Sequence, residues 1–269
     1  MASSVIELQS PKVVSEAEWF SARKELLAKE KEFTRLRDEL SRQRRELPWQ
    51  KVEKRYQFEG RKGKESLAEL FDSRRQLIVY HFMLGPGWSE GCKWCSFLGD
   101  HFDGLTIHLA NRDTTLVVVS RAPLAEIEAF KKRMGWQFKW VSSFESDFNF
   151  DYHVSFSKDE VVKGEVYYNY SMQGFPSEEA PGASVFYKDE KGDLFHSYST
   201  YGRGLDIFLG TYNFLDITPK GRGEDALASP MEWLRHHDRY SEGYFVDSAE
   251  SHSPKVSATS CCSGENHSQ

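Results

Sequence analysis

The chain has 269 residues, 39% of them hydrophobic and 14% aromatic, so it can bury a substantial core as one large domain or two small ones. Its formal net charge of -6 gives no electrostatic reason to bind nucleic acid, and no apolar run reaches the roughly 20 residues that span a bilayer. Its start lacks the segments of a signal peptide, and four cysteines are too few for a secreted disulfide scaffold. We therefore expect a soluble cytoplasmic protein that binds neither nucleic acid nor membranes.

Residues 1–65 are predicted to form an N-terminal helical extension with one long helix at 15–46. Ser15 and Glu18 have the spacing of a capping box at its start, and Pro48 ends it. Apolar residues at spacings of seven, three and four form one stripe along it: Trp19, Leu26, Phe33, Leu36, Leu40 and Leu47. The stripe either packs on the body of its own subunit, which is the commoner use of such a face, or forms a homodimer.

Residues 66–246 are predicted to form one α/β domain. Buried strands are expected at 76–83 and 115–120, and a third strand at 137–142. Helices are expected at 66–71, 92–110, 123–134 and 204–214, and a β-hairpin at 184–188 and 194–198. Strands that alternate with helices predict a mainly parallel sheet with an antiparallel edge. The remaining residues, 247–269, are rich in serine and are expected to be a disordered tail.

Cys92 and Cys95 form a C-x-x-C motif where the first buried strand passes into a helix. The free N–H groups of a helix's first turn favour an anion, so the first thiol ionises more easily. Thiolate is the nucleophile in disulfide exchange, and the second thiol, one turn along, can attack the mixed disulfide. Nearby, Glu90 opposes ionisation of Cys92 and Lys93 supports it.

This placement predicts a thiol-disulfide oxidoreductase with a redox-active disulfide, Cys92 as nucleophile and Cys95 as resolving thiol. Its substrate would be a protein or small-molecule disulfide. A thiol reductant would then return the Cys92–Cys95 disulfide to the dithiol. Two alternatives are an inert buried pair and a metal site that adds His101 and His108. The histidine spacing is wider than the usual zinc pattern and directs the ligands along a helix away from the pair, so we expect no metal and no cofactor.

Pro181 lies just before the hairpin, where thioredoxin folds carry a cis-proline that faces the cysteine pair. The alternative is a trans bond, which is the rule for an ordinary loop proline. With Trp88 and Trp94 beside the motif, Pro181 is the predicted substrate-binding surface.

Two other functions remain open. Ser89 and Cys92 fit the second half of the peroxiredoxin motif Pro-x3-Ser/Thr-x2-Cys, but Pro86 is one residue too close, so a thiol peroxidase is an alternative. An aromatic insertion at 144–180 suggests a non-catalytic binding or scaffold protein if its rings form an apolar groove over the cysteine pair. Those aromatic residues are Phe144, Phe148, Phe150, Tyr152, Phe156, Tyr167, Tyr168 and Tyr170. Plain packing in core and loops is the commoner use of such residues.

Outside the motif, His236, His237 and Asp238 are expected on a C-terminal surface helix rather than in a catalytic site. Cys261 and Cys262, in the tail, are expected to be exposed rather than to relay electrons.

The sequence resembles the mostly bacterial, thioredoxin-like "domain of unknown function 899" family from about residue 13 to about residue 240. The matching segments are 22–31, 47–49, 91–97, 119–124, 134–136, 184–187, 200–203 and 233–238. The resemblance implies an α/β, thioredoxin-like fold of a peroxiredoxin-like variety, with a central mixed sheet, flanking helices and an N-terminal long helix. It implies little about activity. Family members often carry proline and a small residue between the cysteines, where this chain has Lys93 and Trp94.

Overall fold

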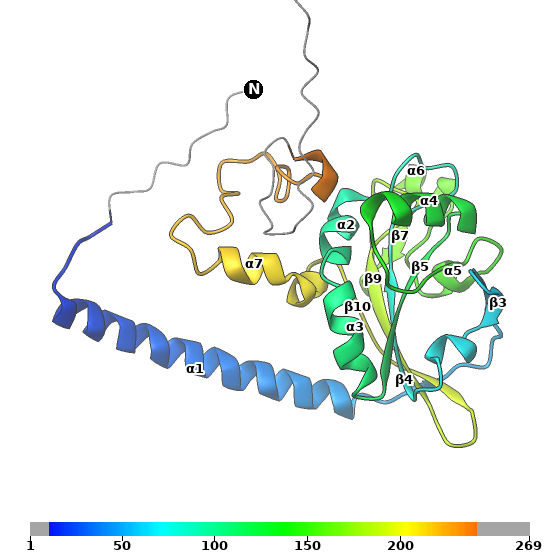
Figure 1. The fold of residues 1–269 in the computed structure, drawn as a ribbon, viewed down its shortest axis with the longest axis horizontal. Helices are drawn as coiled ribbons and strands as arrows, with labels where there is room; N and C mark the ends of the chain where they lie inside the picture. Colours follow the sequence, from blue (N-terminus) through cyan, green and yellow to red (C-terminus); the bar gives the residue numbers. More distant parts are fainter. Residues whose placement is uncertain (1–10, 241–269) are drawn as a thin grey trace, which may run out of the picture.

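The computed structural model describes residues 11–240. Its strands are β1 (Gln50–Lys51), β2 (Gln57–Gly60), β3 (Gly63–Ser66), β4 (Gln76–His81), β5 (Thr114–Ser120), β6 (Trp140–Ser142), β7 (Val166–Tyr168), β8 (Ser171–Gln173), β9 (Gly182–Lys188) and β10 (Leu194–Tyr201). Eight of them form one mixed sheet in the order β1-β10-β9-β4-β5-β6-β2-β3, and β7 pairs with β8. Figure 1 shows this sheet with helices packed on it and one long helix extending away from the body.

The helices follow the predicted order, but the helix predicted at 66–71 is a 3-10 turn and the one predicted at 204–214 is divided into a 3-10 turn and a short α-helix. They are α1 (Glu16–Glu46), α2 (Lys93–Gly99), α3 (Asp103–Ala110), α4 (Leu124–Met134), α5 (Phe148–Asp151), α6 (Lys158–Lys163) and α7 (Gly210–Leu215), with 3-10 turns η1 (Glu69–Phe71), η2 (Gly202–Phe208) and η3 (His237–Arg239). The single helix predicted at 92–110 is divided into α2 and α3. At the break, the Asp103 carboxylate accepts hydrogen bonds from the backbone N–H groups of Gln137 and Phe138.

The central strands have thioredoxin-like topology. β4 and β5 run parallel and are joined by α2 and α3, whereas β9 is antiparallel to β4 and β10 is antiparallel to β9. Along the chain, a β-α-β unit is followed by a β-hairpin and a helical segment, as the expected fold requires. In the sheet, these strands lie side by side in the order β10-β9-β4-β5, and β6, β2 and β3 extend the sheet beyond β5. The predicted fold class is confirmed.

The two faces of the sheet bury different parts of the chain. Successive side chains of a strand point to opposite faces, so Tyr80 of β4 packs with α2 and α4, whereas Leu77 and Val79 pack with η1 and α5 on the other face. From the insertion, Phe148 and Tyr152 lie fully or almost fully buried on this second face, away from Cys95. For these two rings, packing in the core is the observed role.

Residues 50–66, where the sequence predicts no separate element within the N-terminal extension, hold three short strands. These are β1, β2 and β3, which pair with β10, β6 and each other. These strands are two to four residues long and mostly exposed, so their alternation of apolar and polar residues is too short to read in the sequence. The domain divisions at 65 and 246 remain predictions, and the tail 247–269 with Cys261 and Cys262 lies outside the described residues.

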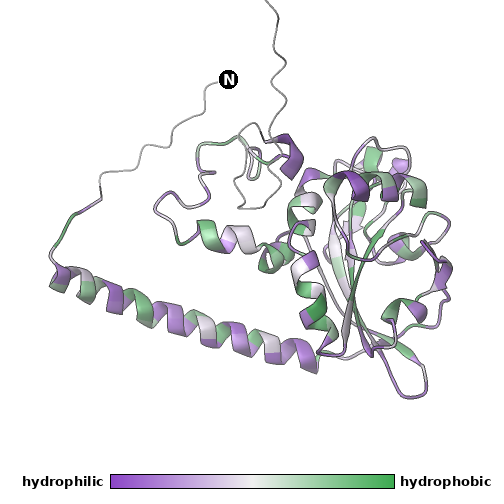
Figure 2. Cartoon of the chain, viewed as in Figure 1, coloured by the Kyte–Doolittle hydropathy of each residue, from purple (hydrophilic) through white to green (hydrophobic). Residues whose placement is uncertain are grey.

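Helix α1 begins as predicted but does not pack on the body of its own subunit. The Ser15–Glu18 capping box is formed, and the helix ends at Glu46. None of its 31 residues is buried. Figure 2 shows hydrophobic and hydrophilic residues alternating along it. The stripe is therefore open to solvent, which overturns the first of the two uses considered for it. No helix of the described part of the chain is long and apolar enough to cross a membrane.

Candidate active site

The cysteine motif stands where the chain returns to the end of β4. After β4 the chain passes through a loop at 85–91, and the Cys92 N–H then donates to the Met83 carbonyl at 3.0 Å. Cys92 is the N-cap of α2, and the Ser96 N–H donates to its carbonyl at 2.9 Å. The buried strand thus fixes the position of the motif, as the sequence predicts.

The two thiols differ in exposure and in acidity. Cys92 and Cys95 lie 4.1 Å apart as free thiols, Cys92 partly exposed and Cys95 buried. A hydrogen bond from the Cys95 thiol, supported by the backbone of Cys95 and Trp94 and by the charge of Lys93, outweighs burial and lowers the pKa of the Cys92 thiol to about 7. Burial and the hydrogen bond to Cys92 raise the pKa of the Cys95 thiol. This is the asymmetry that a nucleophile and a resolving thiol need.

Two tyrosines stand on the buried side of the pair. The sequence did not single out Tyr80, whereas Tyr168 is one of the insertion aromatics considered for a groove over the pair. The Tyr80 hydroxyl hydrogen-bonds Cys95, and the Met83 N–H lies 3.5 Å from the Cys95 sulfur. Tyr168 comes from the insertion and lies close to Cys95. Burial is the main cause that raises the pKa of the Tyr168 hydroxyl, and the charge of a Cys95 thiolate raises this pKa further. Both tyrosines place a hydroxyl group in an otherwise apolar core. The sequence does not reveal this, because only the folded topology brings these hydroxyls to the cysteine pair.

The charged loop before Cys92 is clamped by the end of the described chain. The Arg133 guanidinium lies 2.9 Å from Glu90 and 2.8 Å from Asp238, and it holds the pKa of the Glu90 carboxyl below its usual range. The buried His236 donates to the Gly91 carbonyl at 2.9 Å. His236 therefore sits in a buried contact beside the motif and not on a surface helix. Glu90, held here, does not face the Cys92 thiol as an unpaired charge.

The three predicted substrate-binding residues lie in different settings. Trp94 is 46% exposed beside Cys92, whereas Trp88 is partly buried and packs on the core. Pro181 leads into β9, and its carbonyl accepts a 2.7 Å hydrogen bond from the Tyr168 hydroxyl. Gly182 pairs with His81, so Pro181 lies at the end of β4 from which the motif follows.

Of the two forms that the sequence leaves open for the bond before Pro181, the structure has trans, because residues 11–240 contain no cis peptide bond. The chain before Pro181 runs extended. The Ala180 N–H donates to the Val154 carbonyl at 2.9 Å, and Ser155 forms a bridge with Glu179. This pairing carries the chain directly into β9, so the intrinsic preference of the peptide bond for trans is kept.

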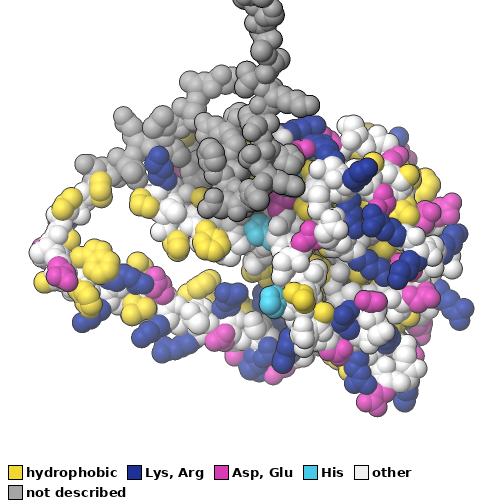
Figure 3. Space-filling model, viewed as in Figure 1, with side chains coloured by type: hydrophobic (Ala, Val, Ile, Leu, Met, Phe, Trp, Pro, Cys, Tyr) yellow, Lys and Arg dark blue, Asp and Glu magenta, His cyan; other side chains and the backbone are white. Residues whose placement is uncertain are grey.

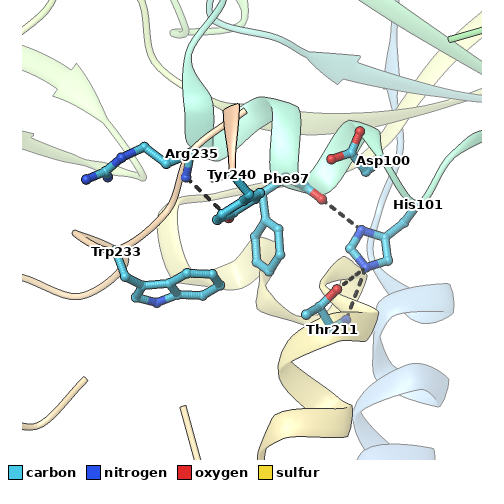
Figure 4. A pocket seen from close by; sticks show the side chains of 7 residues that line it. All are labelled: Phe97, Asp100, His101, Thr211, Trp233, Arg235 and Tyr240. Carbon is cyan, nitrogen blue, oxygen red and sulfur yellow. Dashed lines mark hydrogen bonds between the residues drawn. The ribbon is translucent and has the colours of Figure 1, made fainter. Parts of the chain in front are cut away.

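The candidate metal ligand His101 directs its ring nitrogens to Phe97 and Thr211 and not to the cysteine thiols. Figure 4 shows it among the side chains that line a pocket between α2 and the α7 segment. This pocket has a volume of about 350 Å³. The His101 Nδ1 lies 2.8 Å from the Phe97 carbonyl, and its Nε2 accepts the Thr211 N–H at 3.1 Å. With both ring nitrogens engaged, His101 has no lone pair left for a metal. Among residues 11–240, no three His, Cys, Asp or Glu side chains are grouped to hold a metal ion.

The lowered pKa of Cys92 predicts a pH dependence that distinguishes it from an ordinary thiol. In a Cys261→Ser/Cys262→Ser background, alkylation of Cys92 by iodoacetamide is expected to reach half its maximal rate near pH 7. Cys95→Ala is expected to move this midpoint up, because it removes the hydrogen bond that lowers the pKa most, and Cys95→Ser, which keeps a donor, less so. The measurement is the rate against pH; a midpoint near the ordinary thiol value of about 8.5 would favour a scaffold.

Comparison with known proteins adds a family and a set of distant structures. The family model described as "Bacterial protein of unknown function (DUF899)" matches residues 8–240. No curated protein matches the chain. The peroxidoxin BcpB of Mycobacterium tuberculosis is 12% identical, with 61% of this chain and 95% of that chain covered and a TM-score of 0.40.

Two further solved structures are similarly distant. Peroxiredoxin Q of Xanthomonas campestris is 13% identical over 58% of this chain and 87% of that chain, with a TM-score of 0.39. A thiol:disulfide interchange protein from Bacteroides sp. is 16% identical over 66% of this chain and 97% of that chain, with a TM-score of 0.36. Likeness at this level says nothing about activity.

Proposed function

Because this chain belongs to the DUF899 family, whose description names no activity, we propose its function from the cysteine site itself: a thiol-disulfide oxidoreductase. The observation that carries the proposal is the pair at the start of α2, 4.1 Å apart, one thiol partly exposed and the other buried behind it. The lowered pKa of Cys92 supports the same roles. An inert pair would not need this asymmetry.

The reaction proceeds in two exchanges. The Cys92 thiolate attacks one sulfur of a substrate disulfide, forms a mixed disulfide and releases the other substrate sulfur as a thiolate. Cys95 then loses its proton to solvent or to the released thiolate and attacks the Cys92 sulfur, which frees the second substrate thiolate. The substrate gains two electrons, the Cys92–Cys95 pair becomes a disulfide, and a thiol reductant returns it to the dithiol.

The substrate is proposed to be a protein or small-molecule disulfide that approaches Cys92 from the exposed side. Trp94 offers an aromatic face there, and Pro181 and Trp88 complete the proposed contact surface. Independently of the chemistry, a location in the cytoplasm and a homodimer through α1 are also proposed. In the cytoplasm, glutathione and thioredoxin systems supply the reducing thiols that such a cycle needs.

A thiol peroxidase is the weaker candidate. The Cys92 thiolate would attack a peroxide to give a sulfenic acid and an alcohol or water, and Cys95 would displace water to form the disulfide. The sequence feature behind it, Ser89 three residues before Cys92, has no hydrogen bond to the cysteine in the described contacts. No arginine is among the largest causes of the lowered pKa of Cys92 either.

One assay separates the candidates. With dithiothreitol as donor, the wild-type protein is expected to accelerate the reduction of insulin, and diamide is expected to convert Cys92 and Cys95 into an intramolecular disulfide, seen by peptide mapping. Rapid consumption of hydrogen peroxide with slow insulin reduction would establish the peroxidase instead. Insulin reduction at the rate of buffer, with no disulfide after diamide, would reject both and leave the scaffold.

A further inference from the structure

The apolar stripe of α1 is a heptad repeat and not only an amphipathic face. Five large apolar residues recur at intervals of seven: Trp19, Leu26, Phe33 and Leu40 within α1, and Leu47 directly after its last residue. This is the a position of a coiled coil, and an exact seven-residue repeat holds its seam against a second helix. The d positions, Ala22, Lys29, Leu36 and Gln43, are half apolar. All five a-position side chains are 44–67% exposed, so the seam has no partner within the described chain.

Charged residues flank this seam with opposite signs on its two sides. Every g position is glutamate: Glu18, Glu25, Glu32, Glu39 and Glu46. Three of the four e positions are arginine: Arg23, Arg37 and Arg44, with Glu30 as the exception. In coiled coils the e and g residues choose the partner and its orientation. The pattern therefore carries information about what covers the seam.

The charges select a second copy of this helix in parallel orientation. In a parallel pair, each g residue meets the e residue five positions further along the partner, which sets Glu32 against Arg37 and Glu39 against Arg44. In an antiparallel pair, e meets e and g meets g, so glutamates would face glutamates and arginines would face arginines. The one unfavourable parallel contact involves Glu30, whose charge is already balanced by Arg23 in the same helix at 2.8 Å.

The anchoring of α1 keeps the seam away from the body of its own subunit. Only three residues separate Glu46 from β1, which pairs with β10. In this link, Trp49 packs on the rings of Tyr187 and Phe195 at 4.9 and 6.0 Å, and the Arg44 guanidinium lies over the Tyr198 ring. Figure 3 shows apolar side chains along the edge of α1 that faces the α7 segment, with open space between them.

We propose that α1 forms a parallel two-stranded coiled coil with α1 of a second copy of this chain, which makes the protein a homodimer. Lys29 and Gln43 at d positions weaken the seam, so the dimer dissociates on dilution. The inference stands apart from the redox chemistry, because none of the seam residues contacts the cysteine pair.

The first test is the mass of the full chain by sedimentation equilibrium, from low micromolar to submillimolar protein. The wild type is expected to move from monomer to dimer across this range, and Phe33→Glu is expected to stay monomeric. Since no residue of α1 is buried, near-UV circular dichroism should show the same folded body in both. A wild type that remains a monomer at every concentration would overturn the proposal.

A charge-reversal cycle tests the pairing. Glu32→Arg sets arginine against Arg37, and Arg37→Glu sets glutamate against Glu32; each is expected to weaken the dimer on the order of tenfold, and the double variant to restore it. Asp38→Arg and Lys31→Glu make the same charge changes at outward f positions and are expected to leave the affinity unchanged. A dimer indifferent to all four changes would use another surface and refute the coiled coil.

Orientation is tested by a new cysteine in a background with the four native cysteines replaced by serine. Ala22→Cys lies at a d position, where parallel chains bring residue 22 against itself, so oxidation is expected to give a disulfide-linked dimer. Ala28→Cys, at an outward c position, is the matched control and is expected to remain monomeric on a non-reducing gel. A dimer by mass that fails to cross-link at residue 22 would contradict the parallel arrangement.

Discussion

Replacing Cys92 with serine is expected to abolish disulfide exchange, whereas replacing Cys95 with serine is expected to stop it one step later. The serine hydroxyl is not ionised near pH 7 and does not open a disulfide, so Cys92→Ser should lower the rate of insulin reduction roughly a thousandfold or more. Cys95→Ser keeps the nucleophile Cys92. Because the serine hydroxyl still donates a hydrogen bond, the pKa of Cys92 should rise less than in Cys95→Ala. The mixed disulfide should then accumulate, because nothing displaces the substrate.

The measurement is a non-reducing gel with mass spectrometry of the trapped adduct, alongside the insulin assay. The Cys261→Ser/Cys262→Ser variant is the control and should match the wild type in both readouts. If Cys92→Ser kept the wild-type rate, or if Cys95→Ser trapped adducts on Cys261 or Cys262 instead of Cys92, the assigned roles would be wrong.

Gly91→Ala is expected to be the most disruptive small substitution next to the motif. A Cβ at this position would lie 2.6 Å from the Phe82 ring and 2.7 Å from the Phe130 ring, both buried in the core. Phe82 and Phe130 are fixed by core packing, so moving their rings to admit a methyl group is unfavourable. We therefore expect a loss of about 1–3 kcal/mol in the free energy of unfolding. At about 2–4 °C per kcal/mol for a chain of this size, the Tm should fall measurably.

The matched control is Gly104→Ala in α3, where a Cβ meets nothing within 4 Å. Alanine is the better helix former by about 1 kcal/mol, so this variant should be neutral or slightly stabilised. Thermal unfolding of the two variants is the comparison. Because Gly91 precedes the nucleophile, its variant should also shift the alkylation midpoint of Cys92. Equal Tm values for Gly91→Ala and wild type would show that the rings adjust freely.

Most of the core of the fold could be predicted because its signals are local. The capping box of α1, the apolar run of β4 and the hairpin turn before β10 each need only a few neighbouring residues. The same holds for the cysteine motif, whose place after β4 follows from the strand and the helix on either side. The break between α2 and α3 was not predictable, since it depends on Asp103 reaching backbone groups 34 residues along the chain.

The missed parts of the site share this dependence on distant contacts. Tyr80 reads in the sequence as one more aromatic residue of a buried strand, and only the fold brings its hydroxyl to Cys95. His236 is 145 residues from Gly91, so its buried hydrogen bond left no mark near the motif. The trans bond at Pro181 follows from the pairing of Ala180 with Val154, which lies in an insertion with no regular pattern.

The ion pairs that hold the loop before Cys92 make the two ends of the described chain differ as sites for attaching a tag or probe. Arg239 forms an ion pair with Glu90, two residues before the nucleophile, so the chain leaves residue 240 beside the active site. At the other end, the 31 residues of α1 span about 45 Å, which carries residue 16 far from the cysteines. A purification tag, fluorophore or surface linkage is therefore best placed at the N-terminal end when turnover is to be measured. A probe just after residue 240 would instead report on events at the cysteine pair.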